Sequence, residues 1–168
     1  KVLMGEFIAG LSLGSLVVVG AFVAMTGGSA ATLCDLFPGE VIILSIPPGI
    51  LTALLLFLNE FPDADVDKAG GRFHLVIYLG RKRASYLYIA GLVLTYAFIV
   101  AAPVAGLSSW WVLLGCATIP LSVKAGIMAL KHAEDIPKLV PALGINVMVV
   151  LVTDLLLAVA VVLEMIFS

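Results

Sequence analysis

Three aspartates and two cationic residues gather in one short stretch of the chain, as Asp63, Asp65, Asp67, Lys68 and Arg72. On a helix, residues four apart have Cβ atoms about 5–6 Å apart, so Asp63 and Asp67 would share a face while Asp65 points elsewhere. Carboxylate oxygens suit a hard cation such as Mg²⁺. Lys68 and Arg72, also four residues apart, would neutralise a phosphate group bridged by that metal. The stretch therefore predicts a site for Mg²⁺ and a phosphorylated ligand.

The neighbouring residues predict a short helix around these aspartates. Pro62 suits the first turn of a helix and Gly70-Gly71 suits its end, so we expect a helical turn over about 62–69. A calcium-binding loop is excluded, because Lys68 and His74 stand where that loop needs its Gly and its bidentate Glu. A solvated loop whose charges only set membrane topology remains the alternative.

The elements that position this stretch are predicted to be membrane helices. Of the 168 residues, 62% are hydrophobic and only 12% are charged, and the mean hydropathy is +1.22. A soluble domain carries about 25% charged residues. The apolar runs long enough to cross a bilayer lie near 5–26, 41–58, 85–105, 110–130 and 139–167. We therefore expect an all-α, polytopic bundle of about five transmembrane helices, with the acidic stretch in a cytoplasmic loop over 59–83 and no nucleic-acid partner.

The basic residues predict the orientation of the bundle. With five spans, all nine lie on one side: Lys1, Lys68, Arg72, Arg81, Lys82, Arg83, Lys124, Lys131 and Lys138. The opposite loops, around 27–40 and 105–109, contain no Lys or Arg. Positive charge favours the cytoplasmic side, so the acidic loop should be cytoplasmic in the cell membrane and the C-terminus external. On this view His74 and the cluster Arg81-Lys82-Arg83 are either surface features or anchors on the cytoplasmic side.

A few residues inside the spans are unusual for hydrocarbon. Pro47-Pro48-Gly49 removes backbone donors and should kink or break its helix. Asn146 either lines a substrate cavity or forms an interhelical hydrogen bond, and Lys124 either snorkels or joins the phosphate site. Asp154 lies deeper, where a charge normally faces a cavity or a partner. The small residues of Gly10-x-x-x-Gly14 and Ser122-x-x-x-Gly126 are typical of close helix packing.

One longer pattern resembles a known family. The residues Asn59-Glu60-Phe61-Pro62-Asp63-x-x-x-Asp67-Lys68-x-x-Gly71-Arg72, followed by Leu75-x-x-x-Leu79-Gly80, resemble the second aspartate-rich motif of the UbiA superfamily of intramembrane prenyltransferases. The initial residues are more similar to the branch that prenylates dihydroxynaphthoate (the MenA type). The resemblance implies the C-terminal half of a nine-helix fold, because the family's first motif, Asn-x-x-x-Asp-x-x-x-Asp, does not occur in these residues. We therefore expect that the N-terminal half is missing from this sequence, or that the chain is a half-size relative that works differently.

The resemblance also implies an activity and a set of site residues. It implies a Mg²⁺-dependent enzyme that transfers an isoprenoid chain from a prenyl diphosphate to a lipophilic aromatic acceptor, a quinone precursor such as dihydroxynaphthoate. Asp63 and Asp67 would bind the metal and act in catalysis. Lys68 and Arg72 would bind the diphosphate. Asn59 and Asn146 are weaker candidates for substrate binding.

Other functions remain open at this point. The acceptor of a UbiA-type enzyme could instead be a polar lipid precursor. A membrane transporter or ion-binding subunit would use Pro47-Pro48-Gly49 as a discontinuous helix and Lys124 with Asp154 as a coupling pair, although no second broken span occurs at a matching position. A non-catalytic membrane subunit is a third alternative.

The topology can be tested by cysteine labelling in sealed membranes. We expect positions 68 and 135 to be labelled from the cytoplasmic side and positions 30 and 107 from outside, because the basic residues lie on one side only. Labelling of positions 68 and 30 from the same side would overturn the five-span interpretation.

Overall fold

Membrane-length helices make up most of the chain. The computed structural model describes residues 5–28 and 32–167, so Lys1 and position 30 lie outside the described residues. Within that part there is no strand, and the helices long and apolar enough to cross a membrane are Gly5–Thr26, Cys34–Ala69, Arg81–Val104, Trp110–Lys131 and Ile136–Phe167. The predicted all-α bundle with five spans is therefore confirmed.

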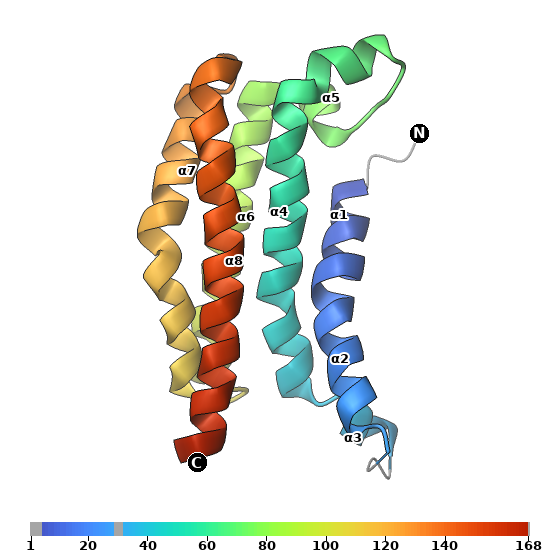
Figure 1. Cartoon of the computed structure of the whole chain (residues 1–168), viewed down its shortest axis with the longest axis vertical. Coiled ribbons are helices and arrows are strands. Elements are labelled where there is room, and N and C mark those ends of the chain that lie inside the picture. The colour runs from blue at the N-terminus through green and yellow to red at the C-terminus, as the bar shows by residue number, and fades with distance from the viewer. Residues whose placement is uncertain (1–4, 29–31, 168) are drawn as a thin grey trace.

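The helices stand side by side with their long axes roughly aligned (Figure 1). The first span consists of three continuous pieces, the middle one a π-helical turn, and the fourth span begins as a 3₁₀-helix. The elements are α1 (Gly5–Ala9), η1 (Gly10–Ser15), α2 (Leu16–Thr26), α3 (Leu33–Leu36), α4 (Gly39–Ala69), α5 (Leu75–Leu79), α6 (Arg81–Val104), η2 (Trp110–Thr118), α7 (Ile119–Lys131) and α8 (Ile136–Phe167).

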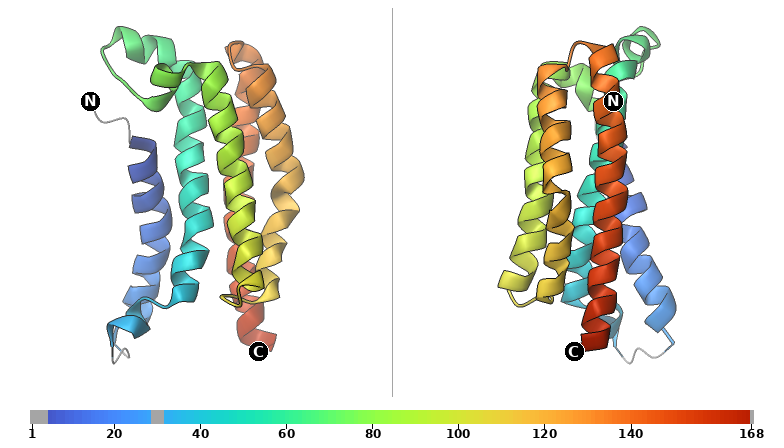
Figure 2. Two further views of the ribbon diagram at one scale, coloured as in Figure 1. Left: turned by 180° about the vertical axis from the view of Figure 1, so that it is seen from behind. Right: turned by 60° about the vertical axis from the view of Figure 1, so that its left-hand side comes forward.

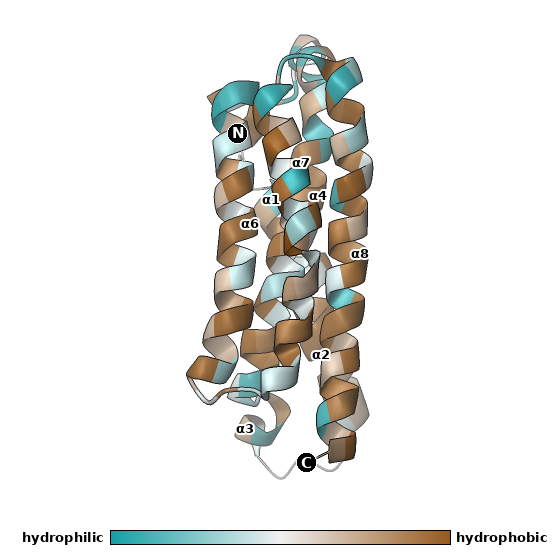
Figure 3. Ribbon diagram, turned by 90° about the vertical axis from the view of Figure 1, so that its left-hand side faces the viewer, coloured by the Kyte–Doolittle hydropathy of each residue, from teal (hydrophilic) through white to brown (hydrophobic). Residues whose placement is uncertain are grey.

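The helix α4 occupies the middle of the bundle. It packs against the first span on one side and against α6 and α8 on the other, as the two views of Figure 2 show. Its side chains Leu51, Leu58 and Phe61 are fully buried in the main core. Outward faces stay apolar along the shafts of the helices, and hydrophilic residues gather at the end that carries the 70–74 loop (Figure 3). This distribution is what a lipid-facing bundle requires.

Of the kink or break expected at Pro47-Pro48-Gly49, the break is wrong, because α4 is continuous through these residues. The two prolines cannot donate to the carbonyls of Ile43 and Leu44. The Ser15 hydroxyl of the first span donates to the neighbouring Ser45 carbonyl at 3.0 Å. Polar side chains on adjacent helices are one means by which membrane helices tolerate proline. The transporter alternative loses its support here, since it depended on a discontinuous helix.

The predicted loop over 59–83 is helical from 59 to 69, which is nearly half of its length. The helix α4 continues to Ala69, so the expected turn over 62–69 is helical but is the end of the second span. Pro62 therefore lies inside this helix and does not begin a new one. The predicted end is confirmed, because Gly70 caps the helix and Gly71 adopts a φ of +77°, a conformation that favours glycine. The short helix α5 and Gly80 then lead into α6.

The expected close packing of small residues is confirmed between the first span and α4. Gly10 and Gly14 face Gly49, and a Cβ atom added at Gly14 would lie 2.5 Å from the Gly49 Cα atom. Backbone atoms cannot move aside as a flexible side chain can. The two helices can therefore approach this closely only without side chains at these positions. Gly126 is also buried, against the Ile89 side chain of α6.

Replacing Gly14 by Leu should destabilise the protein by about 1–3 kcal/mol, the usual cost of overpacking a filled interface. The matched control is Gly20→Leu on the same span, because a Cβ atom at Gly20 meets nothing within 4 Å. Thermal unfolding of both variants in detergent micelles would measure the difference. Equal stability of the two variants would contradict the close contact at Gly49.

Candidate functional site

The charged residues of the sequence pattern lie together at one end of the bundle. The end of α4, the loop over 70–74, α5 and the start of α6 meet there, beside the beginning of the first span and the turn between α7 and α8 (Figures 1 and 2). The polar end of α4 therefore packs against these neighbouring segments and is not surrounded by solvent on all sides.

The helical conformation of α4 aligns three candidate residues. Asn59, Asp63 and Asp67 follow one another at intervals of four residues along the helix, so they lie on one face. Asp63 and Asn59 are exposed. Asp67 is partly buried, with its carboxylate 3.5 Å from Arg72 Nη1 and 3.6 Å from His74 Nε2. The face can thus present carboxylate oxygens to a cation outside the helix.

Asp65 points away from that face and has another partner. Its carboxylate accepts a hydrogen bond from Arg81 Nη2 at 2.9 Å, and Arg81 Nε donates to the Phe61 carbonyl at 2.8 Å. The Arg81 side chain is only 12% exposed. Of the two alternatives for Arg81, the surface feature is therefore wrong: its side chain joins α6 to the end of α4.

The cationic candidates beside the aspartates are accessible. Lys68 is exposed, and the Arg72 side chain is 78% exposed with only a long contact to Asp67. Guanidinium and ammonium groups held this loosely can turn toward a phosphate group. On the neighbouring turn between α7 and α8, the Lys138 ammonium donates a 2.6 Å hydrogen bond to Asp135 and lowers the pKa of that carboxyl. That exposed pair is separate from the aspartate face.

The pattern did not predict a second cluster, formed by Glu6, Glu60 and His74. His74 Nδ1 lies 3.1 Å from Glu60 Oε2, and the His74 side chain is only 12% exposed, so its prediction as a surface feature is wrong. Glu6 of the first span is 3% exposed and accepts a hydrogen bond from the Leu75 amide at 3.1 Å. Only the unusual position of a glutamate at the start of an apolar span could have drawn attention to Glu6.

Asn146 is fully buried between three helices. Tyr88 Oη of α6 donates to Asn146 Oδ1 at 2.8 Å, and Asn146 Nδ2 donates to the Leu54 carbonyl of α4 at 3.3 Å. These contacts agree with the interhelical hydrogen bond that was one of the two roles expected for Asn146. Its role in substrate binding stays a prediction. Lys124 is exposed on α7, which agrees with snorkelling.

A further hydroxyl network links α6, α7 and α8 deeper in the bundle. Thr118 shares hydrogen bonds with Tyr96 at 2.9 Å and with Thr153 at 2.7 Å, and Tyr96 also bonds to Ser122. Single hydroxyl residues in apolar runs gave no pattern from which these pairs could be predicted. The network holds helices together and lies away from the acidic end.

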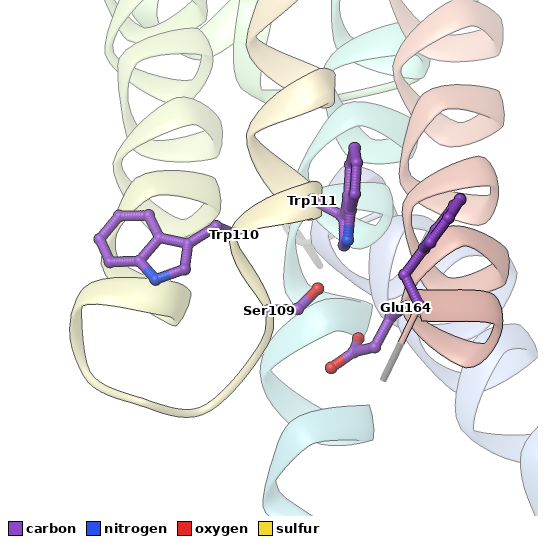
Figure 4. Close-up of a pocket in the computed structure, with 5 residues that line it drawn as sticks. Ser109, Trp110, Trp111 and Glu164 are labelled. Carbon is purple, nitrogen blue, oxygen red and sulfur yellow. The ribbon is translucent and has the colours of Figure 1, made fainter.

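The cavities near the other end of the bundle are mostly apolar. One is lined by Trp110, Trp111 and Glu164, among others (Figure 4). Tryptophans at this position are typical of a membrane–water interface. Another cavity, of about 290 Å³, lies between the first span, α4 and α8 and includes Asp154, one of whose oxygens is buried without a hydrogen-bond partner among the described residues. Asp154 thus faces a cavity, as expected for a charge at membrane depth.

The fold and the acidic end together define a polytopic helical membrane protein with carboxylates and cations placed at the edge of the bilayer. Comparison with family models matches residues 1–140 to the UbiA prenyltransferase family. The chain belongs to this family, as the motif around Asp63 and Asp67 indicated.

A curated relative shows the same relationship. The 1,4-dihydroxy-2-naphthoate octaprenyltransferase of Bacillus subtilis (strain 168) is 31% identical over 121 residues, which cover 72% of this chain and 36% of the relative. The chain thus spans about a third of the length of that relative in the matched region. No solved structure matches the chain.

Removing the Tyr88 hydroxyl should destabilise the bundle, because Asn146 Oδ1 would lose its donor in a buried position. We expect Tyr88→Phe to cost about 0.6–2 kcal/mol, the usual range for a hydrogen bond between membrane helices. Tyr86→Phe is the matched control, since Tyr86 lies on the same helix and is 57% exposed. Unfolding in mixed micelles would compare the two, and identical stabilities would argue against the interhelical role of Asn146.

Proposed function

We propose that this chain forms part of a Mg²⁺-dependent intramembrane prenyltransferase, which transfers an isoprenoid chain from a prenyl diphosphate to a lipophilic aromatic acceptor. The observation that carries the proposal is the continuation of α4 beyond its apolar part, with Asn59, Asp63 and Asp67 on one face and Lys68 and Arg72 exposed nearby. Membership of the UbiA prenyltransferase family supports it.

The donor set of this face fits Mg²⁺. Mg²⁺ prefers oxygen ligands, needs few protein carboxylates and keeps several waters or phosphate oxygens. Asp63 is exposed, and no ion pair or hydrogen bond of its carboxylate is found within residues 5–28 and 32–167. Asp67 supplies the second carboxylate one turn further on. Bound Mg²⁺ would supply positive charge that stabilises the diphosphate leaving group.

The residues around the metal position would bind and orient the donor. Lys68 and Arg72 would donate to diphosphate oxygens and neutralise the charge that develops as the allylic C–O bond breaks. The electron-rich aromatic acceptor then attacks the allylic carbon and loses a proton. Because the reaction takes place at the edge of the bilayer, hydrocarbon would exclude water from the allylic cation.

The isoprenoid tail needs an apolar path from the acidic end into the bundle. Cavities of about 290 Å³ and about 550 Å³ between the first span, α4 and α8 lie deeper, toward the end of the bundle opposite the acidic residues, and would receive the far end of such a chain. Their linings are mostly aliphatic, which suits a chain of isoprene units. The distribution of basic residues supports a cytoplasmic position for the diphosphate end.

The acceptor is proposed to be a dihydroxynaphthoate-type quinone precursor. This proposal depends on the name of the Bacillus relative, which is a 1,4-dihydroxy-2-naphthoate octaprenyltransferase. The first residues of the acidic motif, from Asn59 to Asp63, support the same branch of the family.

Replacing Asp63 or Asp67 by Ala in the full protein should lower the rate of Mg²⁺-dependent prenyl transfer by about 100-fold or more, as is typical when one preorganised electrostatic group is removed. Asp65→Ala is the control, because Asp65 points away from the shared face and pairs with Arg81. Its effect should be much smaller. The assay follows isotopically labelled prenyl diphosphate into product in membranes containing equal amounts of each variant.

Two outcomes of this assay would contradict the assignment. Activity of both variants within a factor of a few of the unmodified protein would exclude the metal site at Asp63 and Asp67. A loss in Asp65→Ala as large as in Asp63→Ala would point to general damage at the end of α4.

A further inference from the structure

Three potential metal ligands from separate parts of the chain converge beside the aspartate face. Glu6 begins the first span, Glu60 lies on α4, and His74 precedes α5. One ligand atom from each lies within 4.8 Å of the other two. The cluster is distinct from Asp63, whose carboxylate lies on the exposed face of α4.

The polar atoms of this cluster are buried but incompletely satisfied. Glu6 is 3% exposed, and only its Oε1 atom accepts a hydrogen bond, from the Leu75 amide. Within residues 5–28 and 32–167, Glu6 Oε2, Glu60 Oε2 and both ring nitrogens of His74 are buried without a hydrogen-bond partner. The 3.1 Å contact between His74 and Glu60 is thus close without being a hydrogen bond. Buried polar atoms are normally paired, so unpaired ligand atoms that face one another call for an occupant.

Within residues 5–28 and 32–167, no Lys or Arg side chain fills this role. Among the ion pairs of the described residues, neither Glu6 nor Glu60 is paired with a Lys or Arg. Glu6 is buried and the Glu60 side chain is 17% exposed, so two negative charges this close together are costly unless a cation or a shared proton lies between them. A metal ion would satisfy both carboxylates and the imidazole at once.

We propose that Glu6, Glu60 and His74 bind one divalent transition metal of the Zn²⁺ class, at a site separate from the Mg²⁺ position at Asp63 and Asp67. An imidazole with two carboxylates favours Zn²⁺ and its neighbours over Mg²⁺, which prefers an all-oxygen set. Three protein ligands with a fourth position left for water are a common arrangement for Zn²⁺. The proposal does not depend on transferase activity.

The observed spacing is compatible with one ion after a small movement. Zn²⁺ lies about 2.0–2.2 Å from nitrogen and oxygen ligands, so two ligands of a tetrahedral site are about 3.4 Å apart. The ligand atoms of this cluster lie within 4.8 Å of one another, so they need to close by at most about 1.4 Å. Rotation of a glutamate side chain supplies this without moving a helix.

His74 has the surroundings of a metal-binding histidine. Its Nδ1 atom faces Glu60, and its Nε2 atom lies 3.6 Å from Asp67 Oδ2. Histidine ligands usually direct the second ring nitrogen at a carboxylate, which fixes the ring orientation. Such an ion would join the first span to the acidic end of α4 and to the loop that precedes α5, and would hold the diphosphate-binding segment in place.

The test is Zn²⁺ binding by the purified full chain without a histidine tag, stripped with a chelator and titrated in competition with a chromophoric zinc indicator. We expect one Zn²⁺ per chain. Glu6→Gln and His74→Ala should each weaken binding at least about 10-fold, the loss found when even an outer partner of a metal ligand is removed. His132→Ala should bind Zn²⁺ as the unmodified chain does, since His132 does not belong to the cluster.

Two further measurements distinguish a lost ligand from a damaged fold. His74→Cys supplies a thiolate, and it should recover the Zn²⁺ affinity lost in His74→Ala. X-ray absorption at the zinc edge should show a shell of nitrogen and oxygen ligands with one imidazole. Binding weakened by Asp63→Asn but not by His74→Ala would overturn the proposal. The absence of Zn²⁺ binding in the unmodified chain would do the same, and would leave Glu6, Glu60 and His74 as a cluster that shares protons.

Discussion

A helix inside hydrocarbon must satisfy its backbone hydrogen bonds without water, and the arrangement of this protein depends on how α4 does so despite three prolines. Because α4 stays continuous, the close contact at Gly49 and the acidic face beyond Leu58 belong to one rigid element. Packing against the first span deep in the bundle therefore orients the aspartates at its end. The chemistry proposed for Asp63 and Asp67 depends on this continuity.

The spans were predictable because hydropathy over about twenty residues is a direct consequence of bilayer thickness. The extent of α4 was not. Pro47-Pro48 and Pro62 are ordinarily signs of a break or a beginning, and the charges after Leu58 mark the end of an apolar run. Judged by the sequence around them, these residues should mark the ends of helices, whereas contacts with the first span and α6 keep them helical. The Ser15 and Arg81 side chains that make such contacts are remote in sequence from the residues they support.

The candidate site was also predictable only in its local features. The spacing of Asp63 and Asp67 is a local property of a helix, so their common face follows from the sequence alone. Burial of Arg81 and His74, and the approach of Glu6, depend on how distant segments meet at the end of the bundle. Asn146 shows the same limit, since its hydrogen bonds with Tyr88 and Leu54 join residues far apart in the sequence, and its role in substrate binding stays a prediction.

The two groups of carboxylates at the end of α4 are physically connected. His74 lies between Glu60 and Asp67, which occupy different turns of the same helix, and the loop that carries it is shaped by Gly71 with a φ of +77°. A change at Glu6 or Glu60 would therefore alter the position of His74, and through it the carboxylate of Asp67. Since Asp67 is also the partly buried member of the proposed Mg²⁺ pair, the first span and the diphosphate-binding face would be coupled through one imidazole ring. This coupling gives the buried glutamate at the start of the first span a reason to be retained in an apolar helix, where an unpaired carboxylate would otherwise be costly.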